Sequence, residues 1–293
     1  MEIVKLIPEC KDNIWGGVKL KEKYGKQTDK NPVAESWELS FHKDGPTRLE
    51  NGKTLQETAT EADLGENCKG FPFFPMLIKF IDAKDDLSVQ VHPSDGYALA
   101  NENSFGKTEM WYIVEAEKGA GIYLGFNRDV TKKEYESAIQ ENRLTELLNF
   151  YEVKAGDCYF IPSGTIHAIG KGCLICEIQQ NSNLTYRVYD YGRKDKNGNE
   201  RELHINKALK VTNLNRFTPI IFEDCLGNCE YFTVQKYEID SELLLFTDEK
   251  SFHCLTCVKG NGFIEDMEIS KGDSFFVPAN YEKYINEWMR SHH

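Results

Sequence analysis

The sequence predicts a mainly β protein that is built from two related β-barrels, the first of which carries a short helical insertion. Two observations support this fold class: short strand-like segments separated by turns dominate the chain, and one stretch of the sequence is repeated. The 293 residues are enough for one large or two modest domains. The chain contains no G-x-G-x-x-G pattern and no Walker loop, so neither nucleotide-binding fold is supported.

The predicted strands are short apolar segments bounded by turns such as Asn51-Gly52 and Asn197-Gly198. They comprise residues 38–41, 76–81, 87–91, 110–114, 158–161 and 174–178. Many short strands with few helices between them are typical of a barrel or a sandwich.

Helices are expected over residues 54–62, 94–101, 131–142 and 144–148. The clearest start is Thr131-Lys-Lys-Glu134, a capping box in which the threonine and the glutamate each satisfy a free backbone N–H. The last two segments form the helical insertion of the first barrel, near residues 128–149.

An internal repeat indicates the domain organisation. The stretch from Gly156 to His167 is echoed from Gly272 to Lys283: each copy reads Gly-Asp, a short apolar strand, then Pro and a turn. We therefore predict a first domain over residues 1–221 and a second, degenerate domain over residues 222–289.

Composition excludes several classes of protein. Lys and Arg number 35 against 47 Asp and Glu, a net charge of −12, whereas nucleic-acid-binding proteins present a dense basic patch. The longest apolar run, residues 71–78, contains two prolines and is too short to cross a membrane. We therefore expect neither a nucleic-acid nor a membrane partner.

Features of the two ends and of the cysteines suggest a cytoplasmic protein. The first nine residues lack the basic start and apolar stretch of a signal peptide, and an odd number of cysteines, nine, suits a reducing compartment. Residues 290–293 look like the remnant of an affinity tag and are left out of functional reasoning.

The repeated stretch also carries a motif that resembles a known superfamily. The spacing from Gly156 to His167 is similar to the second motif of cupins, whose first motif normally supplies two histidines and a glutamate from neighbouring strands. The corresponding stretch here is Gln90-Val-His92, followed by Glu109. The resemblance implies two cupin-like barrels, or jelly rolls, with a metal site in the first.

Four residues form the candidate ligand set: Gln90, His92, Glu109 and His167. Gln90 and His92 lie two positions apart and so share one face of a strand. Three neutral ligands and one carboxylate suit Zn²⁺ better than Mg²⁺ or Ca²⁺. A lone histidine such as His167 is more often a core residue, so the prediction rests on all four together. Because Lys283 replaces His167 in the second copy and a protonated lysine has no lone pair, we expect one Zn²⁺ per chain.

Glutamine in place of the usual first histidine narrows the resemblance to type I phosphomannose isomerases, and the length and the short helical insertion resemble their compact bacterial branch. The matching motifs are Leu87-Ser-Val-Gln-Val-His-Pro93, Gly106-Lys-Thr-Glu-Met-Trp111, Pro162-Ser-Gly-Thr-Ile-His-Ala168, Trp15-Gly-Gly17, Thr185-Tyr-Arg-Val-Tyr-Asp-Tyr-Gly-Arg193 and Arg201-Glu-Leu-His204. The family interconverts mannose 6-phosphate and fructose 6-phosphate through a cis-enediol. The resemblance implies a zinc-dependent isomerase of carbohydrate metabolism, with a sugar phosphate as substrate and a monomer or homodimer as assembly.

Further charged residues lie within predicted strands. Lys107 lies two residues before Glu109, so both side chains point inward if the strand already runs there. Lys79 and Glu177 each interrupt an apolar strand, and we predict that both bind substrate. Lys107 is predicted to be catalytic, and the identity of the proton-transfer base stays open between Lys107 and Glu177.

Arg187 matches the arginine that the family places at its active site, and we predict that it is catalytic. Its guanidinium suits either the developing oxyanion or the phosphate. Arg193 and Lys194 are further candidates for the phosphate, although a solvated basic turn explains them equally well.

Three alternatives compete with this interpretation. A non-catalytic cupin that binds or senses a sugar needs neither Lys107 nor Arg187. A non-haem iron oxygenase favours two histidines and one carboxylate, and Gln90 counts against it. An isomerase of glucose 6-phosphate or of a related sugar phosphate is the third alternative, because the sequence does not reveal the stereochemistry at C2. The pairs Cys173-x2-Cys176 and Cys254-x2-Cys257 have zinc-ribbon spacing, but strand-forming residues separate them, so we interpret them as buried thiols.

Overall fold

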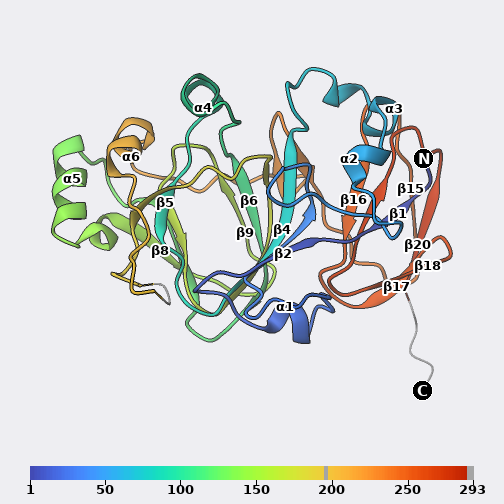
Figure 1. Ribbon diagram of the computed structural model, residues 1–293, viewed down its shortest axis with the longest axis horizontal. Coiled ribbons are helices and arrows are strands. Elements are labelled where there is room, and N and C mark those ends of the chain that lie inside the picture. The colour runs from blue at the N-terminus through green and yellow to red at the C-terminus, as the bar shows by residue number, and fades with distance from the viewer. Residues whose placement is uncertain (195–196, 289–293) are drawn as a thin grey trace.

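The computed structural model describes residues 1–194 and 197–288, and the chain is mainly β (Figure 1). The predicted fold class is therefore confirmed. The expected tag remnant, residues 290–293, lies outside the described residues. No helix in the described part of the chain is both long and apolar enough to cross a membrane.

The strands are β1 (Val4–Leu6), β2 (Glu9–Lys11), β3 (Glu35–Leu39), β4 (Met76–Ala83), β5 (Val89–Val91), β6 (Glu109–Ala116), β7 (Gly121–Phe126), β8 (Leu148–Glu152), β9 (Cys158–Ile161), β10 (His167–Ile169), β11 (Cys173–Gln180), β12 (Tyr186–Tyr189), β13 (Gly227–Asn228), β14 (Thr233–Val234), β15 (Glu242–Leu245), β16 (His253–Thr256), β17 (Asn261–Ile264), β18 (Met267–Ser270), β19 (Ser274–Val277) and β20 (Tyr284–Trp288). The helices are α1 (Lys19–Glu22), α2 (Leu55–Thr58), α3 (Glu61–Leu64), α4 (Asp95–Glu102), α5 (Lys132–Gln140) and α6 (Ile205–Val211), with 3₁₀ turns η1 (Glu66–Cys68) and η2 (Leu144–Leu147).

Two antiparallel sheets face each other in the first two thirds of the chain. Their strand orders are β2-β3-β4-β11-β6-β9 and β12-β5-β10-β7-β8. Side chains of both sheets share one core, which includes Trp111 and Ile175 from the first sheet and Ile122 and Ile169 from the second. Side chains that point inward from either sheet therefore lie between the two sheets.

The outer face of the five-stranded sheet is covered by α5 and α6, at one end of the molecule (Figure 1). Val89 and Val91 of β5 pack there against Tyr135 and Ile139 of α5. Because side chains alternate along a strand, the outward valines direct Gln90 into the space between the sheets.

The last third of the chain contributes to three further sheets, β1-β19-β16, β13-β14 and β15-β20-β17-β18. The N-terminal strand β1 belongs to the first of these, with Val4 opposite Phe276, and Figure 1 shows it among the C-terminal strands. Phe276 packs in one core with Phe80 and Cys176, which lie on the outer face of the six-stranded sheet. The domain boundary at residues 221 and 222 stays a prediction.

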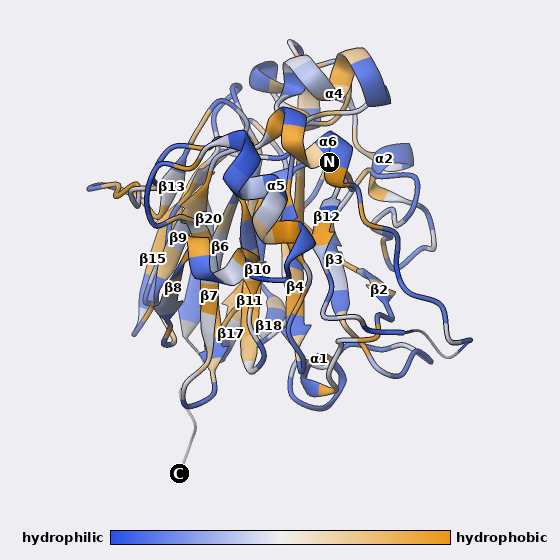
Figure 2. Ribbon diagram, turned by 90° about the vertical axis from the view of Figure 1, so that its left-hand side faces the viewer, coloured by the Kyte–Doolittle hydropathy of each residue, from blue (hydrophilic) through white to orange (hydrophobic). Residues whose placement is uncertain are grey.

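Hydropathy follows this layering. In Figure 2 hydrophobic residues are concentrated along the strands, whereas many of the connecting loops are hydrophilic. The pattern agrees with cores that lie between the sheets and not in the loops.

The helices agree with expectation only in part: α1 and α6 were not predicted, and one predicted helix is divided. The capping box at Thr131 is present, and its hydroxyl accepts a hydrogen bond from the N–H of Glu134. The single helix expected over residues 54–62 is wrong, because Thr54 and Thr60 each form a capping box and each begin a separate short helix, α2 and α3. The segment at 94–101 forms α4, although the Ser94 side chain makes no capping hydrogen bond.

A buried ion pair links the six-stranded sheet to the C-terminal sheets. Lys26 Nζ lies 2.7 Å from Glu38 Oε1, and the two side chains are 5% and 0% exposed. Glu38 also accepts hydrogen bonds from Ser36 at 2.6 Å and from Ser274 of β19 at 3.0 Å. The carboxylate thus joins β3 to β19 through charge-assisted hydrogen bonds.

Replacing Glu38 should destabilise the protein strongly. In Glu38→Ala the Lys26 ammonium stays buried without a counter-charge, so we expect the free energy of unfolding to fall by about 3 kcal/mol or more. The matched control is Glu66→Ala, which removes an exposed pair with Lys69 and should cost less than about 1 kcal/mol. Urea denaturation measures both, and equal losses in the two variants would contradict this view of Glu38.

Candidate active site

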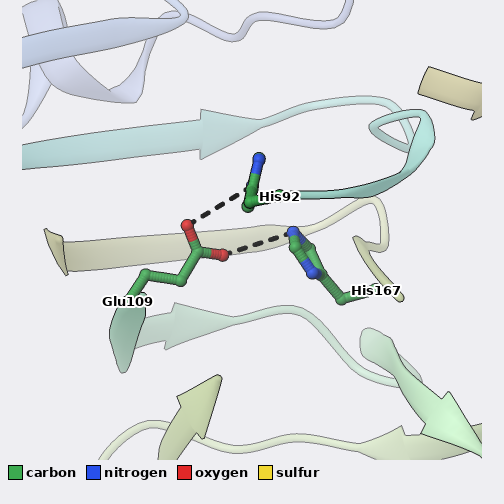
Figure 3. A group of neighbouring side chains, drawn as sticks. All are labelled: His92, Glu109 and His167. Carbon is green, nitrogen blue, oxygen red and sulfur yellow. Dashed lines mark ion pairs between the residues drawn. The ribbon is translucent and has the colours of Figure 1, made fainter. Parts of the chain in front are cut away.

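The structure brings together two histidines and a glutamate from three different strands or strand ends. His92 directly follows β5, Glu109 begins β6 and His167 begins β10. Glu109 Oε2 lies 3.6 Å from His92 Nε2, and Glu109 Oε1 lies 3.3 Å from His167 Nε2 (Figure 3). All three side chains are at most 1% exposed, and one ligand atom from each lies within 4.8 Å of the others.

Backbone carbonyls orient both imidazole rings. His92 Nδ1 lies 2.7 Å from the carbonyl of Leu184, and His167 Nδ1 lies 2.9 Å from that of Thr165. A carbonyl only accepts, so each Nδ1 donates and each Nε2 presents a lone pair toward Glu109. Burial and the charge of Lys107 lower the pKa of both rings, that of His167 to about 4, which keeps them neutral and able to bind a metal.

This donor set fits a small divalent ion. Atoms bound tetrahedrally to zinc at about 2.0–2.1 Å lie roughly 3.3–3.4 Å apart, close to the two distances from Glu109. Glu109 Oε1 is buried and has no hydrogen-bond donor among the described residues. Buried carboxylate oxygens are rarely left without a partner, so an ion is the natural complement of this one.

Gln90 lies beside the two histidines and the glutamate. Its Nε2 is 3.4 Å from His167 Nε2, and its Oε1 is 3.5 Å from the hydroxyl of Ser88. A rotation of the amide by 180° exchanges its oxygen and nitrogen. Oε1 then points toward His92, Glu109 and His167, where it could serve as a fourth metal ligand. The structure thus gathers all four predicted ligands in one place.

A second row of polar side chains lies on the six-stranded sheet. The strand register places Lys79, Glu177 and Trp111 next to one another on β4, β11 and β6. Lys79 Nζ lies 3.0 Å from Glu177 Oε1, and the Trp111 indole donates to Glu177 Oε2 at 2.6 Å. All three side chains are buried.

Lys107 connects this row to the histidines. Its Nζ lies 2.7 Å from Glu109 Oε2, 3.2 Å from His92 Nε2 and 3.5 Å from Glu177 Oε1. The side chain is 5% exposed and points inward, although residue 107 precedes the start of β6. The ammonium therefore lies between the candidate metal ligands and Glu177.

The two buried carboxylates have opposite pKa shifts. Burial, together with the charge of Glu177, raises the pKa of Glu109. Burial also acts to raise the pKa of Glu177, but the charges of Lys107 and Lys79 outweigh it and lower the pKa. Glu177 is therefore an ionised carboxylate held by two ammonium groups, and binding a cation would complete the compensation of Glu109.

Arg187 lies on the opposite sheet, in register with two of the candidate metal ligands. Arg187 of β12 pairs with Gln90 of β5, and Gln90 pairs with His167 of β10. The guanidinium donates to the Ser88 hydroxyl at 3.1 Å and to the carbonyl of Glu202 at 3.0 Å. Ser88 thus lies between Arg187 and Gln90, and it contacts both side chains.

The two further phosphate candidates are placed differently. Arg193 donates to the backbone carbonyl of Asp86 and forms an ion pair with Asp190, so its guanidinium is already engaged by the protein. Lys194 forms a backbone bridge with Glu200. In the described residues, neither side chain pairs with the candidate metal ligands or Lys107.

The cysteines and His253 form no second metal site in the described residues. Cys173 packs between the two sheets, whereas Cys176 packs on the outer face of the six-stranded sheet, as expected for residues three apart on a strand. His253 Nδ1 lies 2.7 Å from the Tyr284 hydroxyl. The described residues therefore support the interpretation of Cys173 and Cys176 as buried thiols.

Sequence reasoning missed several groups that shape the site. Trp111 lies two residues after Glu109 on the same strand, so strand alternation could have placed it inward. Ser88 likewise lies two residues from Gln90, so strand alternation could have placed it inward as well. The carbonyls of Leu184 and Thr165, which orient the histidines, have no sequence signal because every residue has a carbonyl.

Comparisons with known proteins agree with this geometry. Residues 3–119 match the family model "Phosphomannose isomerase type I, catalytic domain", and residues 224–285 match "Mannose-6-phosphate isomerase, cupin domain". The chain is 37% identical to the probable mannose-6-phosphate isomerase GmuF of Bacillus subtilis, over 96% of this chain and 95% of that protein. It is also 37% identical to the mannose-6-phosphate isomerase ManA of the same organism, over 92% and 91% of the two chains.

A solved structure shows the same fold. The mannose 6-phosphate isomerase from Bacillus subtilis superimposes with a TM-score of 0.89 and 35% sequence identity, over 98% of this chain and 97% of that one. The family models, the relatives and the solved structure thus agree over most of the chain, and the chain belongs to the type I phosphomannose isomerase family.

Proposed function

We propose that this protein is a zinc-dependent isomerase that interconverts mannose 6-phosphate and fructose 6-phosphate through a cis-enediol. The observation that carries the proposal is the buried group of His92, Glu109 and His167 with the Lys107 ammonium beside it. Membership of the family supplies the substrate.

The chemistry has two requirements. A proton must move between C2 and C1 of the open-chain sugar, and negative charge that grows on the O1 and O2 edge must be stabilised. When bound, Zn²⁺ supplies a Lewis acid for that edge. Gln90, His92, Glu109 and His167 would hold the ion.

Lys107 is the proton-transfer group in this proposal: as the neutral amine, its Nζ would take the proton from one carbon and return it to the other. Its Nζ is the ionisable group nearest to the ligands that is not itself a predicted ligand, at 3.2 Å from His92 Nε2. Glu177 already accepts from Trp111 and pairs with Lys79, so its carboxylate is better suited to orient Lys107 than to remove a proton.

The remaining charged residues bind the substrate. Lys79 and Glu177 point into the same interior and offer a donor and an acceptor for sugar hydroxyls. Arg187 lies across from them on β12, with its guanidinium beside the metal ligands. A fixed cation at that place stabilises either the phosphate or the developing oxyanion.

A non-catalytic cupin that binds a sugar is the second candidate. It would need the ligands and the polar interior but not a buried ammonium within hydrogen-bonding distance of a ligand. The position of Lys107 therefore favours an enzyme. Formation of fructose 6-phosphate from mannose 6-phosphate by the purified protein distinguishes the two.

Metal removal should abolish the activity. A chelator that strips the ion leaves the enediolate edge without its electrophile, so turnover should stop, and added Zn²⁺ should restore it. The measurement is a coupled assay of fructose 6-phosphate, accompanied by metal analysis of each sample. Full turnover in demonstrably metal-free protein would contradict the mechanism.

Loss of Arg187 should impair catalysis without unfolding the protein. We expect Arg187→Ala to lower kcat/KM by at least ~10²-fold, about 2.7 kcal/mol, as for the loss of one charge-stabilising group. Arg143→Ala is the control, because Arg143 is exposed and pairs only with the surface residues Glu141 and Glu146. Near-normal kinetics in folded Arg187→Ala would reduce the residue to a structural role.

Each chain should bind one catalytic metal ion. Metal analysis should return about one Zn²⁺ per chain, because the described residues hold one group of suitable ligands. His253→Ala should leave occupancy and turnover intact, whereas His167→Ala should lose the ion. Two ions per chain, one of them lost in His253→Ala, would overturn the proposed stoichiometry.

A further inference from the structure

The backbone that carries Lys107 is fixed at three consecutive N–H groups. The N–H of Gly106 donates to Asp95 Oδ1 at 2.6 Å, that of Lys107 to the carbonyl of Pro93 at 3.0 Å, and that of Thr108 to Gln180 Oε1 at 2.8 Å. We call residues 106–108 the lysine loop. Two of these three N–H groups donate to side chains, and the Thr108 carbonyl also accepts from the N–H of Gln180 at 3.1 Å, so side chains and backbone together determine where the loop lies.

Close packing makes the position of this loop specific. A Cβ atom on Gly106 would lie 2.5 Å from the backbone carbon of Ser94, closer than real Cβ contacts come. Only glycine lets the loop approach the start of α4 at this distance. A shift of the α4 start would therefore shift the loop.

Asp95 controls both side-chain contacts. Its Oδ1 accepts from the N–H of Gly106 and also from Gln180 Nε2 at 2.7 Å, so it orients the amide that receives the N–H of Thr108. Its place in the first turn of α4 suits a negative charge. The carboxylate thus holds both ends of the lysine loop.

The other oxygen of Asp95 is bound from the C-terminal third of the chain. Tyr231, in the turn between β13 and β14, donates its hydroxyl to Asp95 Oδ2 at 2.5 Å. The ring of Tyr231 is itself fixed, with its centroid 5.7 Å from that of Phe71 and 6.4 Å from that of Phe105. Phe105 directly precedes the lysine loop and is buried.

We propose that Tyr231 is a positioning residue for catalysis: through Asp95, it fixes the lysine loop and so holds Lys107 Nζ beside His92 and Glu109. Only the expected effect of Tyr231 on turnover rests on the proposed function; its effect on the position of the loop does not. It also gives the region that matches the cupin-domain model, residues 224–285, a contribution to the active site that requires no metal of its own.

The test compares Tyr231→Phe with Tyr237→Phe. Both variants remove one hydroxyl from the C-terminal third, but Tyr237 is 47% exposed and contacts Gln235, far from the lysine loop in the hydrogen-bond network. Hydrogen exchange of a peptide that covers residues 104–108 measures the loop directly, with no substrate present. Steady-state kinetics and metal analysis follow on the same samples.

We expect Tyr231→Phe to speed exchange in this peptide and to lower kcat by about three- to ten-fold, the size expected from weakening one hydrogen bond. KM should change less than about two-fold and zinc content not at all, because Arg187 lies on β12 and Glu109, which follows the loop, is held by the pairing of β6 with β9 and β11. In an Asp95→Ala background, Tyr231→Phe should have no further effect, since the pathway is already broken. Tyr237→Phe should match the wild type.

Unchanged exchange in Tyr231→Phe would overturn the proposal. The proposal would also be overturned if Tyr231→Phe lowered kcat in the Asp95→Ala background by the same factor as in the wild type. If the wild-type chain failed to isomerise mannose 6-phosphate, the proposed function would fall. The exchange measurement would still decide whether Tyr231 holds the loop.

Discussion

The site depends on a carboxylate that is removed from water. Glu109 is fully buried between two sheets, where an ionised group costs several kcal/mol unless opposite charge compensates it. Lys107 and Lys79 supply two positive charges, but Glu177 and Glu35 share them with Glu109, so the balance is incomplete. The two histidines are neutral, so they add no positive charge, but their lone pairs point toward Glu109. A bound cation would compensate the charge of Glu109 and accept these lone pairs, which accounts for the arrangement of the donors.

The register of the antiparallel strands places the charged and polar residues of the site in rows on the two facing sheets. Arg187, Gln90 and His167 form a row across one sheet, while Lys79 and Glu177 pair across the other. Residues in such rows lie side by side because paired positions on neighbouring strands are about 5 Å apart. The two facing sheets are stiff, since helices cover one outer face and the C-terminal sheets cover the other, and a stiff site can hold reacting groups at fixed distances.

Local signals in the sequence predicted the parts that local chemistry determines. The strand at 158–161 was predicted with the bounds observed for β9, because a Gly-Asp turn and Pro162 mark its two ends. Strand alternation placed Gln90 and His92 on one strand face, whereas the gathering of the four candidate ligands was expected from the cupin resemblance. The contact of Tyr231 with Asp95 was beyond reach, since it joins residues 136 positions apart, and the break at Thr60 was missed because its second capping box was not recognised.

Crystallography at the zinc absorption edge tests the central claim most directly. Crystals grown with Zn²⁺ should show one anomalous peak per chain, bound by His92 Nε2, His167 Nε2 and a carboxylate oxygen of Glu109 at about 2.0–2.2 Å. Gln90 should present Oε1 to the ion, with Nε2 turned toward Ser88. A peak elsewhere in the chain, or an ion that Glu109 does not bind, would contradict the account.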